Sequence, residues 1–116
     1  MLEKPAFIQG TFSAMGQGLD TPVPLRPAAR YRVPGDKRAQ TIYFRAGNAS
    51  TELIAFVLTR RGEPMRYFPV GAKQGVHVPL AVLEDIPPET EIEVLVAAPA
   101  GVATTVVVDV GFMEIG

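Results

Sequence analysis

The chain has 116 residues with 11 Pro, 11 Gly and no Cys, is 47% hydrophobic and carries a net charge of −1. This length suits one domain, and the apolar content excludes a disordered chain. The absence of Cys excludes disulfides and thiolate metal sites. The many Pro and Gly residues predict short strands joined by tight turns.

The N-terminal part predicts one strand followed by an irregular arm. Residues 6–13 alternate, with Ile8 and Phe12 on one face and polar side chains on the other. Residues 14–29 break this pattern with Gly, Pro and small residues. A Pro-rich strap is already extended and loses little entropy on binding, so we expect the arm to attach the protein to a neighbour. It offers three apolar anchors: Leu19, Val23 and Leu25.

Alternation continues along the middle of the chain and predicts four more strands: 30–33, 40–45, 65–70 and 75–80. The segment 52–59 differs from them because both of its faces are apolar. Such a strand is expected to be covered on both sides. Its second face therefore predicts contact with another subunit through three residues: Leu53, Ala55 and Val57.

The C-terminal part predicts two strands, 90–98 and 103–115, joined as a hairpin by the turn "PAG". The segment 80–85 before them can form a short helical turn. The last strand has apolar residues on its outer face as well, which also predicts an intersubunit contact. These residues are Val107, Met113 and Ile115.

Together these elements predict an all-β protein of seven to eight short antiparallel strands. We expect a single β-sandwich or jelly-roll domain over residues 1–116 with an extended N-terminal arm. A small β-barrel is the alternative.

The charge is divided unevenly along the chain. The segment from Arg26 to Arg66 carries +6, and the segment from Tyr67 to the C-terminus carries −6. Two segments of opposite charge can neutralise each other within one domain or between neighbouring copies.

No catalytic, cofactor or metal site is expected. His77 is the one histidine, and a transition-metal site needs several such ligands. Glu91 and Glu93 share a strand face, and Asp109 would lie opposite them across the predicted hairpin. Carboxylates in such an array usually form a solvated face, so we expect no hydrolytic site.

Tyr43 and Arg45 share an outer strand face and form a possible ligand face. An aromatic ring beside a guanidinium group can bind single-stranded nucleic acid, but the sequence pI of 5.8 argues against this partner. A sandwich face with aromatic side chains can also bind carbohydrate, although the chain has no Trp and 3 Tyr.

The leading interpretation is a non-enzymatic structural or assembly protein that forms a symmetric oligomer or joins another structural protein in a larger shell. In organisation it resembles the small β-rich decoration or cement proteins of tailed-phage heads. In "RAGNASTELIAFVL", "EPMRYFPV" and "GVHVPL", within residues 41–80, it is similar to the soluble sensory rhodopsin transducer family. That similarity implies a signalling adaptor, which together with carbohydrate binding forms the alternative function. Single-stranded nucleic-acid binding is the second alternative.

The expected location is the cytoplasm or a virion. No apolar run approaches the length that spans a bilayer, so no membrane partner is expected. The N-terminus lacks the apolar core of a signal peptide.

Overall fold

The structure is a computed structural model that describes residues 3–80 and 84–116. Half of the helical turn expected at 80–85 therefore lies outside the described residues, and Asp85 belongs to a strand. The described residues contain nine strands and no helix. The strands are β1 (Glu3–Met15), β2 (Val23–Arg32), β3 (Arg38–Asn48), β4 (Ile54–Arg60), β5 (Glu63–Val70), β6 (Gly75–Pro79), β7 (Asp85–Ile86), β8 (Glu91–Ala97) and β9 (Ala103–Ile115).

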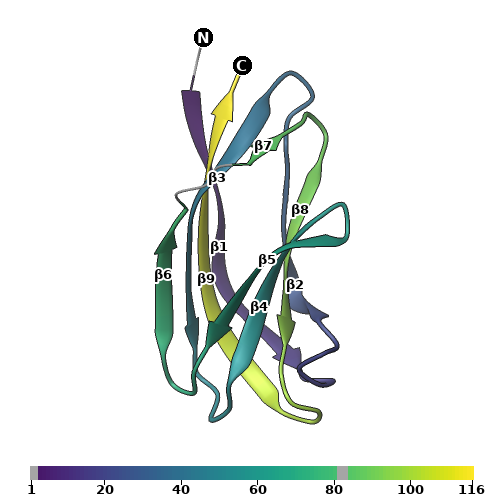
Figure 1. Ribbon diagram of the computed structural model, residues 1–116, viewed down its shortest axis with the longest axis vertical. Helices are drawn as coiled ribbons and strands as arrows, with labels where there is room; N and C mark the ends of the chain where they lie inside the picture. Colours follow the sequence, from purple (N-terminus) through teal and green to yellow (C-terminus); the bar gives the residue numbers. More distant parts are fainter. Residues whose placement is uncertain (1–2, 81–83) are drawn as a thin grey trace.

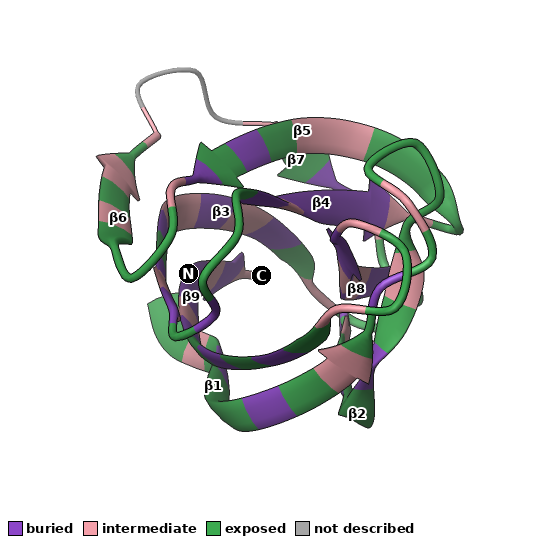
Figure 2. Cartoon of the chain, turned by 90° about the horizontal axis from the view of Figure 1, so that it is seen from below, coloured by how far each residue is buried: buried purple, intermediate pink, exposed green. Residues whose placement is uncertain are grey.

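The strands form two facing antiparallel layers (Figure 1). One layer has the order β1-β9-β3-β6, with β7 also paired to β3, and the other has the order β2-β8-β4-β5. A single residue pair, Ser13 with Arg26, joins β1 to β2. Seen from one end, the strands surround a buried interior as a nearly closed ring (Figure 2). The predicted all-β antiparallel sandwich is therefore confirmed.

Aromatic side chains hold the two layers together. The ring of Phe44 on β3 stacks on Phe68 of β5 at 4.0 Å between centroids, and it lies 5.6 Å from Phe56 of β4. Ile8 and Phe12 of β1 are buried in the same core, as their alternation predicts.

A polar contact closes the end of the core where both termini lie (Figure 1). The hydroxyl of Tyr31 on β2 donates a 2.6 Å hydrogen bond to Glu114 Oε2 on β9, and the Tyr31 ring stacks on Phe112. Glu114 is buried. Burial first, and then the neighbouring Glu114, raise the pKa of Tyr31 well above its ordinary value. This hydrogen bond therefore connects the two layers with a neutral phenol donor.

Asn48 fixes the connection between the layers at the end of β3. Its amide donates to the carbonyls of Glu52, Val70 and Gly71, and its Oδ1 accepts hydrogen bonds from the backbone and hydroxyl of Ser50. A buried amide with this many partners holds a turn in place without regular pairing. The β3–β4 turn is thus tied to the end of β5.

The predicted arm at 14–29 is wrong in its extent. Residues 14 and 15 belong to β1, and β2 begins at Val23, so the irregular part is confined to a short turn. Pro24 and Pro27 suggest a broken strand, but β2 pairs regularly only with β8, and its register shifts between Pro24 and Ala29. A strand with one open edge and a bulge tolerates residues that lack an N–H.

The predicted C-terminal hairpin is also wrong. β8 pairs with β2 and β4, whereas β9 pairs with β1 and β3 in the other layer. The "PAG" turn therefore crosses from one layer to the other. Local pattern identifies both strands but does not say which neighbours they choose, because a hairpin and a crossing connection need similar turn residues.

Candidate functional site

A cluster of polar side chains lies on the outer face of the β1-β9-β3-β6 layer, with Asp109 at its centre. Gln9 Nε2 donates to Asp109 Oδ1 at 3.1 Å, and the Tyr43 hydroxyl donates to the same oxygen at 2.8 Å. Arg45 Nη2 donates to Asp109 Oδ2. Four side chains from three strands are thus linked through one carboxylate, and we call them the Asp109 cluster.

Strand register explains why these residues meet. Gln9, Asp109, Arg45 and His77 occupy one row across β1, β9, β3 and β6. Residues in such a row point to the same side of the sheet. The Tyr43 ring lies in the next row, and His77 packs against it edge-on at 5.9 Å between centroids. Each strand thus contributes one side chain to a continuous polar row.

The cluster has defined charges. Partial burial acts to raise the pKa of Asp109, but hydrogen bonds from Arg45, Tyr43 and Gln9 outweigh it, and the net pKa is lowered. Burial and the hydrogen bond to Asp109 raise the pKa of Tyr43. The hydrogen bond to Asp109 raises the pKa of Arg45. Near neutral pH the cluster therefore holds one carboxylate, one guanidinium and a neutral phenol.

A shallow hollow of about 330 Å³ adjoins the cluster. Arg45 and Asp109 form its polar side, and Val107, which is 55% exposed, forms an apolar side. Gly47 lies in the same row as Val107, and a Cβ there would meet nothing within 4 Å. The hollow is therefore open above Gly47.

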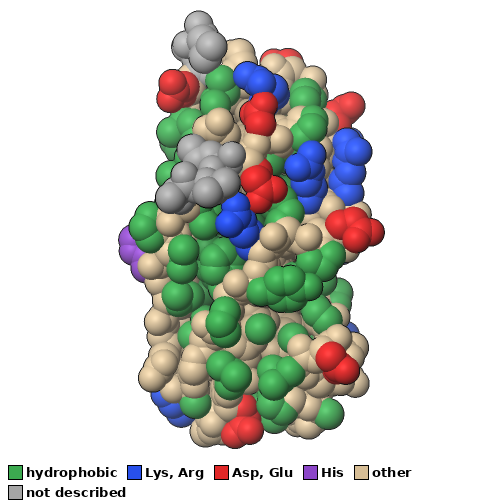
Figure 3. Space-filling model, in the orientation of Figure 1, with side chains coloured by type: hydrophobic (Ala, Val, Ile, Leu, Met, Phe, Trp, Pro, Cys, Tyr) green, Lys and Arg blue, Asp and Glu red, His purple; other side chains and the backbone are tan. Residues whose placement is uncertain are grey.

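The outer face of the other layer has an apolar region over β4, β5 and β8. Tyr67, Val57 and Leu95 form a row across β5, β4 and β8, and Pro69 and Ala55 form the next row. Tyr67 is 63% exposed, and Leu53, just before β4, is 49% exposed. Hydrophobic side chains gather over the lower half of the side on which β4 and β5 lie, with charged side chains above them (Figure 3). We call the set Leu53, Ala55, Val57, Tyr67, Pro69 and Leu95 the apolar face.

The charged segments neutralise each other inside the chain. Six ion pairs between described residues join the basic middle segment to the acidic C-terminal segment. They are Arg30–Glu91, Arg30–Glu93, Arg32–Glu89, Arg38–Asp85, Arg45–Asp109 and Arg66–Glu84. Of the two arrangements that the sequence allows, the structure has the one within a single domain.

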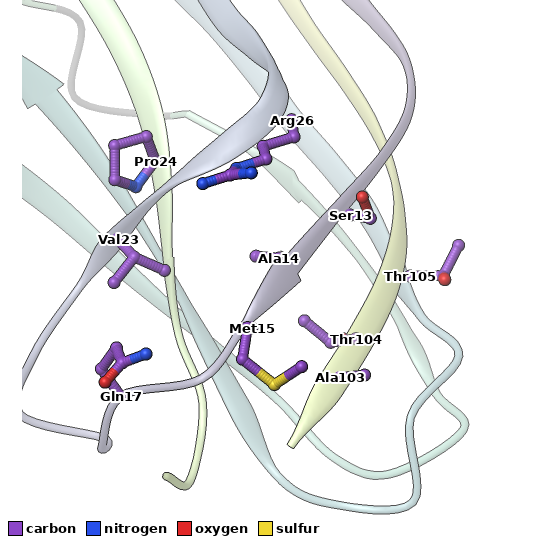
Figure 4. A pocket seen from close by; sticks show the side chains of 10 residues that line it. All are labelled: Ser13, Ala14, Met15, Gln17, Val23, Pro24, Arg26, Ala103, Thr104 and Thr105. Atoms are coloured by element: carbon purple, nitrogen blue, oxygen red, sulfur yellow. The ribbon is translucent and has the colours of Figure 1, made fainter. Parts of the chain in front are cut away.

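A larger cavity of about 570 Å³ opens beside the end of β1, where the two layers separate. Figure 4 shows Val23, Pro24 and Gln17 on one side of β1 and three β9 residues on the other. The cavity is lined by small and flexible side chains, with Arg26 as its charged group. It therefore marks an opening in the sandwich rather than a set of converging polar groups.

The predicted interface residues differ in how far they are exposed in the structure. Leu25 is 1% exposed and belongs to the core, so its prediction as an arm anchor is wrong. Val57 is also 1% exposed, so it offers almost no surface to a partner, although it lies in the same row as Tyr67 and Leu95. Leu19 is exposed and Val23 half-buried.

The other predicted interface residues lie on opposite sides of the sandwich. Leu53 and Ala55 belong to the apolar face, whereas Val107, Met113 and Ile115 lie on the outer face of β9. They do not form one surface, and an interface role for either group stays a prediction.

The predicted array of three carboxylates does not form. Glu93 lies beside Arg30 in the β2-β8-β4-β5 layer, and Glu91 lies in the next row, opposite Arg32. Asp109 lies in the opposite layer, because the expected hairpin is absent. Tyr43 and Arg45 do share a face as predicted, but Gln9 and Asp109 were missed. Alternation identifies both as outward-facing, yet the pairing of β1 with β9 is not visible in local sequence.

Among residues 3–80 and 84–116, no three His, Cys, Asp or Glu side chains are grouped closely enough to hold a metal ion. The same residues include no helix that could cross a membrane.

No protein-family model and no curated protein sequence matches the chain. Solved structures do match it. The CBM36-1 domain of a multidomain xylanase from the hindgut metagenome of Trinervitermes trinervoides is 13% identical, with a TM-score of 0.58, and the match covers 97% of this chain and 98% of that domain.

A chain of infectious bursal disease virus, Gt strain, is 11% identical, with a TM-score of 0.50. That match covers 97% of this chain and 32% of the viral chain, so this protein spans about a third of the viral chain's length. At these identities both similarities show the β-sandwich fold alone.

Proposed function

We propose that the protein is a non-enzymatic assembly module that self-associates through its apolar face. The observation that carries this proposal is the exposure of Tyr67 and Leu53, at 63% and 49%, beside half-buried Ala55 and Leu95 on the outer side of one layer. Contiguous apolar surface of this kind commonly marks a contact between proteins. Aromatic residues such as Tyr67 often dominate the binding energy of these contacts.

A second copy of the chain is the occupant that fits this face. The charged end of the same face holds Arg30, Arg32, Glu91 and Glu93, and these residues pair with one another or with Glu89 inside the chain. The face is therefore close to neutral and does not call for an oppositely charged partner. A two-fold contact places the same patch of both copies against each other, which suits a nearly neutral, apolar surface.

The structural similarities are compatible with this proposal at a coarse level. One similar chain comes from a virus and the other is a carbohydrate-binding module, so the fold suits either assembly or binding. Incorporation into a larger shell, such as a virion, is the finer form of the proposal.

Sedimentation velocity on the full chain over a range of micromolar concentrations tests the proposal. We expect a concentration-dependent oligomer, and we expect the double variant Leu53→Ser, Tyr67→Ser to weaken it at least about tenfold. Phe7→Ser is a matched control, because Phe7 is 48% exposed on the outer face of the other layer. A chain that stays monomeric at every concentration, or that loses association in the Phe7→Ser variant instead, overturns the proposal.

Carbohydrate binding is the second candidate function. The specific observation that favours it is the Asp109 cluster, in which hydrogen-bonding groups from three strands are held beside an open hollow.

A further inference from the structure

We propose that the hollow beside Arg45, Gly47, Val107 and Asp109 is a binding site for neighbouring hydroxyl groups of an uncharged saccharide. This inference rests on the second candidate function and not on the assembly role. Its volume of about 330 Å³ lies at the lower end of the range for small-molecule pockets. A site of this size takes one or a few sugar units along the sheet surface rather than a deeply enclosed ligand.

The hydrogen-bonding capacity left in the cluster matches hydroxyl groups. Asp109 accepts three hydrogen bonds from described residues, and a carboxylate has about four acceptor positions, so one remains. Arg45 has about five N–H donors, of which its bond to Asp109 uses one. One sugar hydroxyl can donate to the carboxylate of Asp109 while a neighbouring sugar hydroxyl accepts from the guanidinium of Arg45.

The charge of the hollow favours an uncharged ligand. Arg45 and Asp109 form an ion pair, so the site has little net charge near neutral pH. An anionic ligand that approached the remaining N–H groups of Arg45 would be repelled by the neighbouring carboxylate of Asp109, which already offsets the charge of the guanidinium. A sugar without carboxylate or sulfate groups avoids this repulsion.

The other side of the hollow suits the C–H surface of a sugar ring. Val107 supplies exposed apolar area, and Gly47 leaves space where another residue would place a side chain. Polar groups on one side and an apolar wall on the other are the usual composition of small-ligand sites. The mutual hydrogen bonds of Gln9, Tyr43, Arg45 and Asp109 hold the polar side in position before a ligand arrives, which reduces the ordering cost of binding.

Isothermal titration calorimetry on the full chain tests the site with uncharged oligosaccharides: cellohexaose, xylohexaose, mannohexaose and laminarihexaose. Hexagalacturonic acid serves as the anionic comparison. We expect at least one uncharged oligosaccharide to bind more tightly than the anionic one. Gly47→Val fills the hollow without changing a charge, and Asp109→Asn removes the central carboxylate. Each should weaken binding at least tenfold, whereas Tyr67→Ser on the apolar face should leave it unchanged.

The possible outcomes separate the site from the function. Binding that Gly47→Val and Asp109→Asn leave intact overturns this site but keeps carbohydrate binding, which then occurs elsewhere on the chain. Tighter binding of hexagalacturonic acid overturns the uncharged class of ligand. No binding to any of the uncharged oligosaccharides overturns both the site and the second candidate function, and it leaves the assembly proposal untouched.

Discussion

The two outer faces of this sandwich are built on the same two-residue strand period, but one carries a hydrogen-bonded polar cluster and the other an exposed apolar region. On the β1-β9-β3-β6 layer, outward side chains hydrogen-bond to one another around Asp109. On the β2-β8-β4-β5 layer, the apolar face exposes Leu53, Tyr67 and Pro69, with Ala55 and Leu95 half-buried beside them. The polar side chains of the first face are held by hydrogen bonds within the chain. The apolar side chains of the second face are stabilised further only when a partner buries them. This difference suggests a ligand surface on one side and an assembly surface on the other.

The largest stability effect should come from crowding the polar face. A Cβ at Gly111 would lie 2.1 Å from Cε2 of Tyr43, so Gly111→Ala must displace that ring and its hydrogen bond to Asp109. We expect the free energy of unfolding to fall by about 2–3 kcal/mol, as in other overpacked sites. Urea denaturation followed by circular dichroism measures this change.

Gly47→Ala is the matched control on the same face. Its Cβ would meet nothing within 4 Å, so stability should change by less than about 0.5 kcal/mol. If both variants are equally stable, the ring of Tyr43 is not held against Gly111, and the polar face is less organised than this comparison requires.

The limits of sequence reasoning differ between the two faces. The apolar face was partly predicted, because residues 53–58 are apolar at every position, so that alternation puts apolar side chains, including Leu53 and Ala55, on both sides of the strand. The Asp109 cluster was recognised only in Tyr43 and Arg45, which lie on one strand. Its other members come from β1 and β9, and their meeting depends on pairing between the two ends of the chain. Alternation reports the side to which a residue points, but not its neighbour across the sheet.

The prolines of β2 mislead for a related reason. Pro24 and Pro27 lower the local tendency to form a strand, yet Leu25 and Ala29 beside them are each 1% exposed in the core. Burial of these side chains outweighs the local preference, which is weak in strands compared with tertiary context. The predicted arm therefore becomes a strand, and only a short turn after β1 stays irregular.

The buried hydrogen bond from Tyr31 to Glu114 gives a stability effect against which changes on the two outer faces can be compared. Tyr31→Phe removes the phenol that donates to buried Glu114, and it should lower the free energy of unfolding by about 1–2 kcal/mol near neutral pH. The pKa of Tyr31 is raised in the folded state, so unfolded Tyr31 loses its proton first as the pH rises above its ordinary value of 10.0. Stability of the unmodified protein should therefore decline above that pH.

The variant should show a smaller decline above pH 10.0, with the remainder arising from Tyr43, whose pKa is also raised. Denaturation curves recorded on both sides of that pH give the comparison. Equal slopes for the variant and the unmodified protein would mean that Tyr31 does not keep its proton through burial and Glu114.

The smallest effect should come from removing the charge at the centre of the polar face. Asp109→Asn keeps the shape of the side chain but loses the ion pair with Arg45, whose side chain is 56% exposed. Pairs with an exposed partner contribute little, so we expect the free energy of unfolding to fall by about 1 kcal/mol or less near neutral pH.

The pKa of Asp109 is lowered in the folded state, so its contribution to stability is present above the ordinary value of 3.8 and is lost as the pH falls below it. The variant lacks this contribution, and its stability should fall less steeply in acid. Urea denaturation between neutral pH and strong acid measures the slopes, with Asp20→Asn in the exposed turn after β1 as a control that should follow the unmodified protein. Parallel curves for Asp109→Asn and the unmodified protein would show that the cluster does not hold this carboxylate in its charged form, and the polar face would then lose the preorganisation that distinguishes it from the apolar one.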